Sequence, residues 1–383
     1  MHFSWPPAYL DHAQSVTAFA RETLSGHARE NDAAQRFPRE LWKACADFGI
    51  QGLALPAAYG GPLAEVDFPR ALLAMEALGK GCDDNGLAFA LNAQMWTVQT
   101  PLLHFGSGAQ KQKYLPGMAA GDIIGAHALT EPEAGSDVMS MQLSAVKTDG
   151  GYVLNGEKHL ITLAPLADFV LVFAQGNPKL KGWGISAFLV DRGTPGFTLS
   201  EKHTKMGVRT VPIGSMTFTD CFLPEEALVG RDGLGYSIMN HSLEYDRCCI
   251  LASQLGAMER QLDDTVAFAK KRRQFDRPVG KFQAVSHRIV DMKVRLETAR
   301  LLLYKTAWLK QEGKSARLEA TMLKLYLSEA FVASSMDAIR TFGGAAYLGA
   351  GGVERDLRDA VGGVLYAGTS DIQKNIIAQY LGL

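Results

Sequence analysis

Residues 129–137 are LTEPEAGSD, and the character of the chain changes at this segment. Before it, runs such as LDHAQSVTAFARETL (10–24) and PRALLAMEALGKG (69–81) place apolar residues three and four positions apart, which predicts amphipathic helices. After it come short segments rich in β-branched and aromatic residues, separated by Gly, Asn, Asp and Pro, which is typical of an antiparallel β-domain. These segments are GYVLNGEKHLIT (151–162), ADFVLVFAQ (167–175), GISAFLVDR (184–192) and SMTFTDCFL (215–223).

The helical pattern returns after about residue 231 in longer runs. We expect one helix of many turns over 238–275, a second over 283–313 and a third over 318–344, which ends at the Gly343-Gly344 pair. Long amphipathic helices in series favour a bundle. The predicted fold is a multidomain α+β protein with an N-terminal helical domain (1–120), a central antiparallel β-domain (121–230) and a C-terminal bundle of four-helix type (231–383).

Composition indicates an ordinary globular chain. Of 383 residues, 47% are hydrophobic, 39 are basic and 40 are acidic, so the net charge of −1 offers no track for nucleic acid. The sequence has no run of 18 apolar residues, so we expect no membrane-spanning helix, and the N-terminus lacks a secretory pattern. The five cysteines form no C-x-x-C pair, so we expect no metal site and a cytoplasmic location. Cys248 and Cys249 lie in an apolar stretch and are expected to fill the core.

Taken alone, LTEPEAGSD is a polar loop with Gly135 and with hydroxyls at Thr130 and Ser136. Such a loop can present backbone N–H groups and hydroxyls to a ligand, but an ordinary turn has the same composition. No G-x-G-x-x-G follows a predicted strand, and no G-x-x-x-x-G-K-[ST] occurs. A dinucleotide bound by this chain would therefore not use a Rossmann loop or a P-loop.

Five segments, taken in order, resemble the motifs of the acyl-CoA dehydrogenase family. TEPEAGSD (130–137) is similar to the family's TEPGAGSD, and NGEKHLIT (155–162) is similar to its NGEKxWIT. Further matches follow, in RRQFDRPVGKFQAVSHRIVDM (272–292), DAIRTFGGAAY (337–347) and YAGTSDIQ (366–373). The resemblance runs at family-like spacing from about residue 125 to the C-terminus. It implies FAD-dependent α,β-dehydrogenation of an acyl thioester, on CoA or on a carrier protein, with FAD held between the β-domain and the bundle.

The resemblance also assigns contacts around the flavin. Leu129 and Thr130 would meet its pyrimidine edge, and Thr162 would lie near N5, the hydride acceptor. Ser136 would lie near the pyrophosphate and near the pantetheine arm of the substrate. Leu160 takes the place of the family's usual Trp beside the flavin, so the packing of the ring differs here.

The resemblance assigns a second group of cofactor contacts. Arg272, Phe275 and Gln283 would contact the FAD of a neighbouring subunit, and Arg272 suits this role because an arginine fork donates to phosphate bidentately. Arg340 replaces a family Gln and adds a charge near the dinucleotide. The remaining positions are Gly343 and Gly344, which would allow close backbone approach, and Thr369 and Asp371, which would cap the FAD site.

The catalytic base is displaced from its usual place. Most family members carry a Glu in the YEGT motif, but this chain has Ala367, which cannot accept a proton. A minority place the base on a bundle helix, one residue before an Arg that matches Arg247, and Asp246 occupies that position. Its side chain is shorter than that of Glu by about 1.5 Å, which limits its reach. Glu244 is the second candidate, and the third alternative is that neither residue is the base.

Helix geometry separates the two candidates, because residues two apart point about 200° away from each other. Glu244 and Arg247 are three apart and share a face, so Glu244 is expected to pair with Arg247 or to lie along the pantetheine channel. The expected substrate contacts are Ser136, Glu244, Arg247, Tyr366 and Gly368.

Partners and competing functions follow from the same resemblance. The reduced flavin would pass its electrons to an electron-transfer flavoprotein or another acceptor, and shared FAD sites would require a homodimer or homotetramer. One alternative is a flavin-dependent oxidase or monooxygenase on the same fold. The absence of the YEGT Glu and the presence of Leu160 near the flavin are both compatible with this alternative. A non-catalytic FAD-binding homologue is the other.

Overall fold

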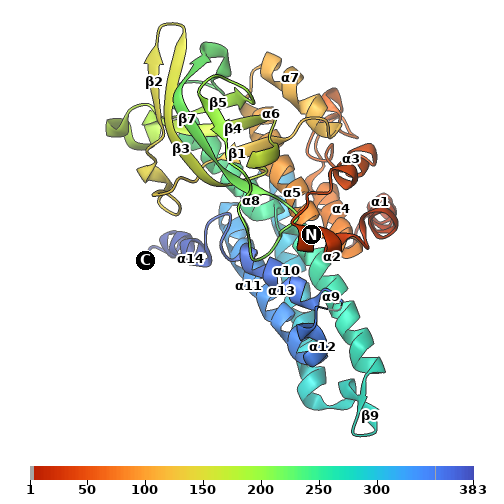
Figure 1. The fold of residues 1–383 in the computed structure, drawn as a ribbon. Helices are drawn as coiled ribbons and strands as arrows, with labels where there is room; N and C mark the ends of the chain where they lie inside the picture. Colours follow the sequence, from red (N-terminus) through yellow and green to blue (C-terminus); the bar gives the residue numbers. More distant parts are fainter. Residues whose placement is uncertain (1–3, 350) are drawn as a thin grey trace.

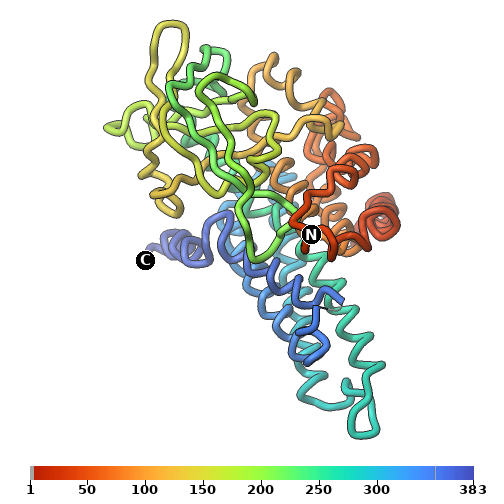
Figure 2. Tube along the Cα trace, viewed as in Figure 1, coloured from red at the N-terminus to blue at the C-terminus, as the bar shows by residue number. Residues whose placement is uncertain are grey.

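The computed structural model describes residues 4–349 and 351–383. Helices form the two ends of the chain and a curled sheet forms the middle, as Figure 1 shows from red through green to blue. Figure 2 traces the same path, with the C-terminus beside the lower edge of the β-domain. No helix in the described residues is long and apolar enough to cross a bilayer.

The first part of the chain is helical. Asp67 and Asp84 cap α4 and α5 by accepting backbone N–H groups, and Ser107 and Gln110 form a capping box on α7. The elements are α1 (Pro7–Phe19), the π-helix η1 (Ala20–Leu24), α2 (Ala28–Ala34), α3 (Arg39–Asp47), the 3₁₀ turn η2 (Ala57–Tyr59), α4 (Phe68–Gly81), α5 (Asn85–Gln94), the π-helix η3 (Met95–Gln99), α6 (Thr100–Phe105) and α7 (Gly108–Ala119).

The central sheet has seven strands in the order β1-β4-β2-β3-β7-β6, and β5 pairs with the other edge of β4. Most pairs are antiparallel, as expected from the alternating segments, but β4 runs parallel to both β1 and β2. The strands are β1 (Gly125–Ala128), β2 (Ser144–Thr148), β3 (Gly151–Thr162), β4 (Phe169–Gln175), β5 (Ile185–Asp191), β6 (Phe197–Leu199) and β7 (Ile213–Pro224). Short 3₁₀ turns are η4 (Val138–Ser140), η5 (Ala164–Leu166), η6 (Pro178–Gly184) and η7 (Glu225–Ala227).

The C-terminal bundle contains one more helix break than expected. The single helix predicted over 238–275 is wrong, because α8 and α9 are separated at Ile250 and Leu251, and the chain turns into a hairpin after Lys271. Both separating residues are buried in the core, so tertiary packing overrides a continuous helical pattern. The elements are α8 (Gly235–Cys249), α9 (Ala252–Lys271), β8 (Arg273–Gln274), β9 (Arg277–Pro278), η8 (Val279–Lys281), α10 (Gln283–Gln311), α11 (Arg317–Phe342), α12 (Gly344–Tyr347), α13 (Val353–Gly363) and α14 (Ser370–Tyr380).

The helices of the two ends share one hydrophobic core, because α4 packs along α9. Two glycines allow their backbones to approach closely. A Cβ at Gly79 would lie 1.8 Å from the carbonyl oxygen of Ser253, and a Cβ at Gly256 would lie 1.9 Å from that of Glu76. Both Cys248 and Cys249 are buried in this core, as predicted.

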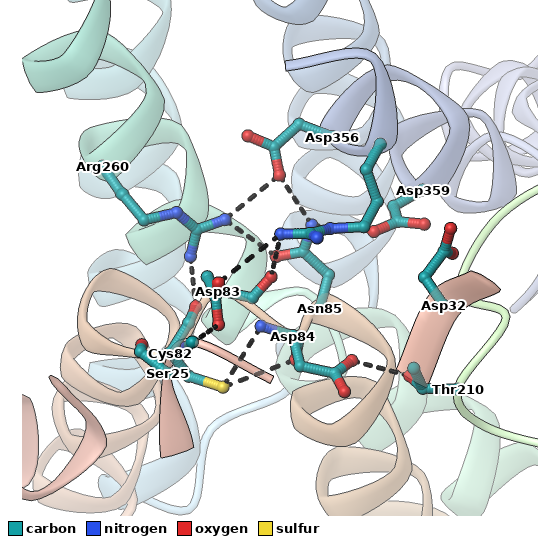
Figure 3. Close-up of polar contacts among 12 residues, drawn as sticks. Ser25, Asp32, Cys82, Asp83, Asp84, Asn85, Thr210, Arg260, Asp356 and Asp359 are labelled. Carbon is teal, nitrogen blue, oxygen red and sulfur yellow. Dashed lines mark hydrogen bonds and ion pairs between the residues drawn. The ribbon is translucent and has the colours of Figure 1, made fainter. Parts of the chain in front are cut away.

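A buried polar junction joins all three parts of the chain (Figure 3). Arg260 of α9 donates to Asn85 Oδ1 at 3.2 Å and to Asp356 Oδ1 at 3.1 Å, and Asn85 in turn donates to Asp356 at 2.9 Å. Asp84 caps α5 and accepts from the hydroxyl of Thr210, in the loop after β6, at 2.6 Å. These bonds tie the sheet to both sets of helices.

A second buried contact fixes the segment with which the β-domain begins. The Nζ of Lys158 in β3 lies 2.7 Å from Glu131 Oε1 and 2.9 Å from the carbonyl oxygen of Leu129. Lys158 is 0% exposed and Glu131 is 4% exposed. Glu131 also accepts the backbone N–H of Leu143, and the N–H of His159 donates to the Thr130 carbonyl at 2.8 Å. The loop 129–137 is thus held against β3.

We predict that Lys158→Met lowers the free energy of unfolding by about 3–5 kcal/mol, because it leaves the Glu131 carboxylate buried without a counter-charge. The matched control is Lys113→Met, which removes an exposed ion pair with Asp191 and should cost at most about 1 kcal/mol. Urea unfolding measures both. Equal losses in the two variants would show that the burial of the Lys158 pair is unimportant.

Candidate active site

A cleft with a cavity volume of about 370 Å³ lies where the sheet meets the helices. Its walls come from α5 and η3, from β1 and the loop 129–139, from the end of β3, from α8, and from the segment 366–376. The cleft therefore draws on all three parts of the chain. Of the residues singled out from the sequence, it brings together Leu129, Thr130, Ser136, Leu160, Thr162, Asp246, Arg247, Tyr366 and Gly368.

The sheet side of the cleft combines apolar surface with hydroxyls. Leu160 is 54% exposed, large for an apolar side chain, and it has a positive φ of 57° at an irregularity in the pairing of β3 with β7. This irregularity directs Leu160, Ile161 and Thr162 in succession to the cleft wall. The opposing loop adds Thr130 and Ser136, and the space beside Gly135 is open, since nothing lies within 4 Å of a Cβ there.

Asp246 is the one carboxylate among the described residues that line this cleft. It is 8% exposed, and its Oδ1 is buried without a hydrogen-bond partner. Burial raises the pKa of Asp246 to about 7, against the attraction of Arg247 and Lys324, which lowers it. A carboxyl group with this pKa can both hold and release a proton near neutral pH.

Glu244 lies in a different place. It lines a second cavity, which adjoins the cleft through Tyr236, Asn240 and Arg247. Its carboxylate is held by Lys310 at 2.8 Å and by Arg317 at 3.4 Å. Among the described residues it forms no ion pair with Arg247, so that alternative is not met, and the alternative of a place along the pantetheine channel stays a prediction. Lys310 of α10 and Arg317 of α11 bind its carboxylate instead. Asp246 and Glu244 point in different directions, as expected, because each lines a different one of the two adjoining cavities.

Arg247 and Tyr366 are polar groups that line the cleft beside Asp246. The Nε of Arg247 is buried without a hydrogen-bond partner, and the guanidinium lines both cavities. Gln254 donates to the hydroxyl of Tyr366, and burial raises the pKa of Tyr366 so that the phenol stays neutral. Ala367 and Gly368 both have positive φ, so their backbone curves along the cleft wall.

The other predicted cofactor contacts do not reach the cleft within one chain. Arg272, Phe275 and Gln283 lie at the far end of the bundle, beside the β8–β9 hairpin at the bottom of Figure 1. Phe275 is 89% exposed, and space is open around both Gly343 and Gly344. The complete set outside the cleft is Arg272, Phe275, Gln283, Arg340, Gly343, Gly344, Thr369 and Asp371.

Several of these outlying residues have local roles that the structure shows. Arg340 lies 3.5 Å from Asp337 and is largely exposed. Gly343, with a φ of 61°, is the C-terminal residue that ends α11, as predicted. Thr369 caps α14 by accepting the N–H of Ile372, and Asp371 is exposed in the first turn of that helix.

Sequence reasoning missed part of the cleft wall. Apart from Asp246 and Arg247, α8 contributes a face of residues spaced three and four apart. That periodicity, counted outward from Asp246, was a signal that could have found them. They are Tyr236, Met239, Asn240 and Leu243 of α8, followed by Ile250 directly after its end. Gln94, Thr97 and His127 also line the cleft and have no such signal.

The fold and the site together define a three-part enzyme with a cleft between its sheet and its helices. Family models of acyl-CoA dehydrogenase match its N-terminal domain at residues 9–122, its middle domain at 126–221 and its C-terminal domain at 233–382. The chain belongs to the acyl-CoA dehydrogenase family. The family resemblance, the helical–β–helical fold class, FAD as cofactor and the oxidation of acyl thioesters are thereby confirmed.

Particular relatives are similar over the whole chain. An L-prolyl-[peptidyl-carrier protein] dehydrogenase from Pseudomonas fluorescens is 39% identical, covering 100% of both chains. The crystal structure of the prolyl acyl carrier protein oxidase AnaB is 42% identical with a TM-score of 0.97, covering 99% of this chain and 100% of that one. The FAD complex of PigA is 40% identical with a TM-score of 0.97, covering 100% of each.

The residues of the cleft fit a flavin. An exposed apolar surface at Leu160, hydroxyls at Thr130, Ser136 and Thr162, and open space at Gly135 suit a flat ring with polar edges. The unpartnered Nε of Arg247 leaves a donor available for a ligand.

The raised pKa of Asp246 predicts a stability effect. The unfolded pKa is about 3.9 and the folded one about 7, so the folded state binds more protons between these values and stability falls as pH rises through them. Asp246→Asn removes this penalty. We expect the difference in unfolding free energy, variant minus native chain, to increase by up to about 4 kcal/mol from pH 4 to pH 7 and then to stay constant.

Urea unfolding of the FAD-free protein at successive pH values measures the difference. The control is Asp371→Asn, which changes a largely exposed carboxylate and should give a flat difference. A flat difference for Asp246→Asn as well would place its pKa near the ordinary value.

Proposed function

We propose that this enzyme removes the α-proton and a β-hydride from an aminoacyl thioester, a prolyl group on the phosphopantetheine arm of a carrier protein. The support for the substrate is that two of the similar proteins are named for prolyl groups on carrier proteins, at 39% and 42% identity over nearly whole chains. A prolyl-CoA thioester presents the same pantetheine arm and is the closest alternative substrate.

The observation that supports the chemistry best is the position of Asp246. It is the sole carboxylate among the described cleft residues, it is buried, and its Oδ1 has no partner. We assign it as the base that accepts the α-proton, in preference to Glu244, which Lys310 and Arg317 hold in the second cavity. A pKa of about 7 suits a group that takes a proton at neutral pH.

The remaining cleft residues position the two ligands. Leu129, Thr130, Ser136, Leu160 and Thr162 would hold the flavin, with hydroxyls toward its polar edges. Ser136, Arg247, Tyr366 and Gly368 would border the thioester, and Glu244 would border the arm where the second cavity continues the cleft. FAD bound here supplies the acceptor for the β-hydride. The low exposure of Asp246 keeps water from its carboxylate, which strengthens its basicity.

A second chain would complete the cofactor site. Arg272, Phe275 and Gln283, with Arg340, Gly343, Gly344, Thr369 and Asp371, are the residues we assign to FAD contacts across or beside a subunit interface. Exposed apolar side chains support association, since α10 leaves Val290 56%, Val294 57% and Leu301 57% exposed. We therefore propose a homodimer or homotetramer.

Electron-transfer flavoprotein is the proposed oxidant of the reduced enzyme. One observation favours a second candidate, since the similar protein AnaB is described as an oxidase. In that case dioxygen would reoxidise the enzyme after the same dehydrogenation. Adding air or electron-transfer flavoprotein to the anaerobically reduced enzyme separates the two, because only an oxidase recovers its flavin absorbance rapidly in air alone.

We predict that Asp246→Asn slows bleaching of the flavin band by substrate at least 10²-fold, because removal of a general base typically costs 10²–10⁴-fold. The variant should still bind FAD. Anaerobic stopped-flow absorbance measures the rate, and Glu244→Gln is the matched control, expected to retain reduction within about tenfold. Loss of reduction in Glu244→Gln with retention in Asp246→Asn would exchange the two assignments.

The substrate is tested with one panel of thioesters under anaerobic conditions. We expect prolyl groups on a phosphopantetheinyl carrier protein to bleach the flavin faster than prolyl-CoA, and faster than butyryl groups on either carrier. Preference for butyryl-CoA would contradict the proposed substrate but not the dehydrogenation. A bound flavin that no thioester bleaches would favour a non-catalytic homologue.

A further inference from the structure

Lys324 of α11 is a charged group that the cleft chemistry has not used. Its side chain is 0% exposed, and its Nζ has no hydrogen-bond partner. Within residues 4–349 and 351–383, no carboxylate oxygen lies within 4.0 Å of this Nζ, so Lys324 forms no ion pair there. A buried ammonium without a partner is costly, so its position requires a compensating role.

The buried carboxylate on the neighbouring helix α8 is that of Asp246. Helices α8 and α11 pack against each other, and the attraction of Asp246 acts more strongly on Lys324 than that of Glu329 does. Glu329 is engaged elsewhere, because it accepts a hydrogen bond from Ser370 at 2.6 Å. Asp246 Oδ1 and Lys324 Nζ are therefore two buried, unpartnered groups of opposite charge on adjacent helices.

We propose that Lys324 is a positioning residue whose buried ammonium, acting across a gap, keeps the carboxylate of Asp246 ionised and ready to accept a proton. The inference rests on the proposed function in so far as Asp246 is the base. Lys324 does not line the cleft, so it acts on Asp246 without touching the substrate.

The gap between the two groups has a physical consequence. A direct salt bridge would occupy a carboxylate oxygen and hold the pKa of Asp246 well below neutral, which makes a weak base. Burial without any cation would raise the pKa of Asp246 further and leave it protonated. A cation beyond ion-pair distance gives an intermediate result, consistent with a pKa of about 7 for Asp246.

Other charged groups near Asp246 do not replace Lys324. Arg247 lowers the pKa of Asp246 more strongly than Lys324 does, but it lines both cavities, whereas Lys324 is fully buried behind the cleft. Tyr366 and Cys249 stay neutral because burial raises the pKa of each. Glu244 forms an ion pair with Lys310. Burial lowers the pKa of Lys324 to about 8, so Lys324 is charged at neutral pH.

The test removes the charge and follows the titration of Asp246 directly. The infrared band of the protonated Asp246 carboxyl is identified by subtracting the spectrum of the Lys324→Met/Asp246→Asn double variant from that of Lys324→Met. In Lys324→Met this band should persist to a pH about one unit or more higher than in the native FAD-free protein. The acid limb of kcat/KM should move up by the same amount. The matched control is Lys205→Met, which changes a half-buried lysine in another part of the molecule, where the carboxylates that attract it are Asp359, Asp32 and Asp84.

The outcomes distinguish this inference from the proposed function. An unmoved infrared titration in Lys324→Met, or an equal move in Lys205→Met, would overturn the role of Lys324. A displaced titration together with full activity of Asp246→Asn would instead remove Asp246 as the base and keep the electrostatic coupling.

Instability of Lys324→Met is covered by the same set of variants. If it folds poorly, Lys324→Gln replaces it in the titration. In addition, Asp246→Asn should reduce the stability loss caused by Lys324→Met, because the unpaired carboxylate is then absent. Purely additive losses of unfolding free energy would contradict the coupling.

Discussion

In the interior between β3 and the loop before it, the ammonium of Lys158 meets the carboxylate of Glu131 at 2.7 Å. Neither group has water to solvate it, so each requires the other, and the loop cannot leave the strand without exposing a buried charge. This constraint sets the spacing between the hydroxyls of the loop and the exposed Leu160 on β3. The sheet side of the cleft therefore depends on two residues that do not line it.

The cleft also illustrates how burial and distant charges together set the character of a carboxyl group. Asp246 is buried by helices from both ends of the chain, which raises its pKa, while Arg247 and Lys324 oppose that effect. Glu244, two residues away, has the same chemistry but lies against two cations in another cavity. The helix that carries both residues gives them different surroundings, and the surroundings separate their roles.

Motifs established the family, the three-part fold and the cofactor, because five segments had to match in order and each has a demanding local pattern. The β-segments and the helices over 283–311 and 317–342 were predictable from periodicity and from the Gly343 stop. The break between α8 and α9 was not, since Ile250 and Leu251 continue a helical pattern and only packing in the core separates them. The two cations that hold Glu244 could not be predicted for a similar reason, because Lys310 and Arg317 are distant from it in sequence.

The sequence by itself determined which residues could do the chemistry. Ala367 excludes the usual base, and Asp246 beside Arg247 supplies a carboxylate on a helix. Only the tertiary structure decided which carboxylate faces the cleft and how strongly it holds a proton. The physical reason is that a local pattern fixes the direction of a side chain from its own helix. Burial and the charge of Lys324, in contrast, come from elements distant in sequence, α5, α11 and the segment 366–368.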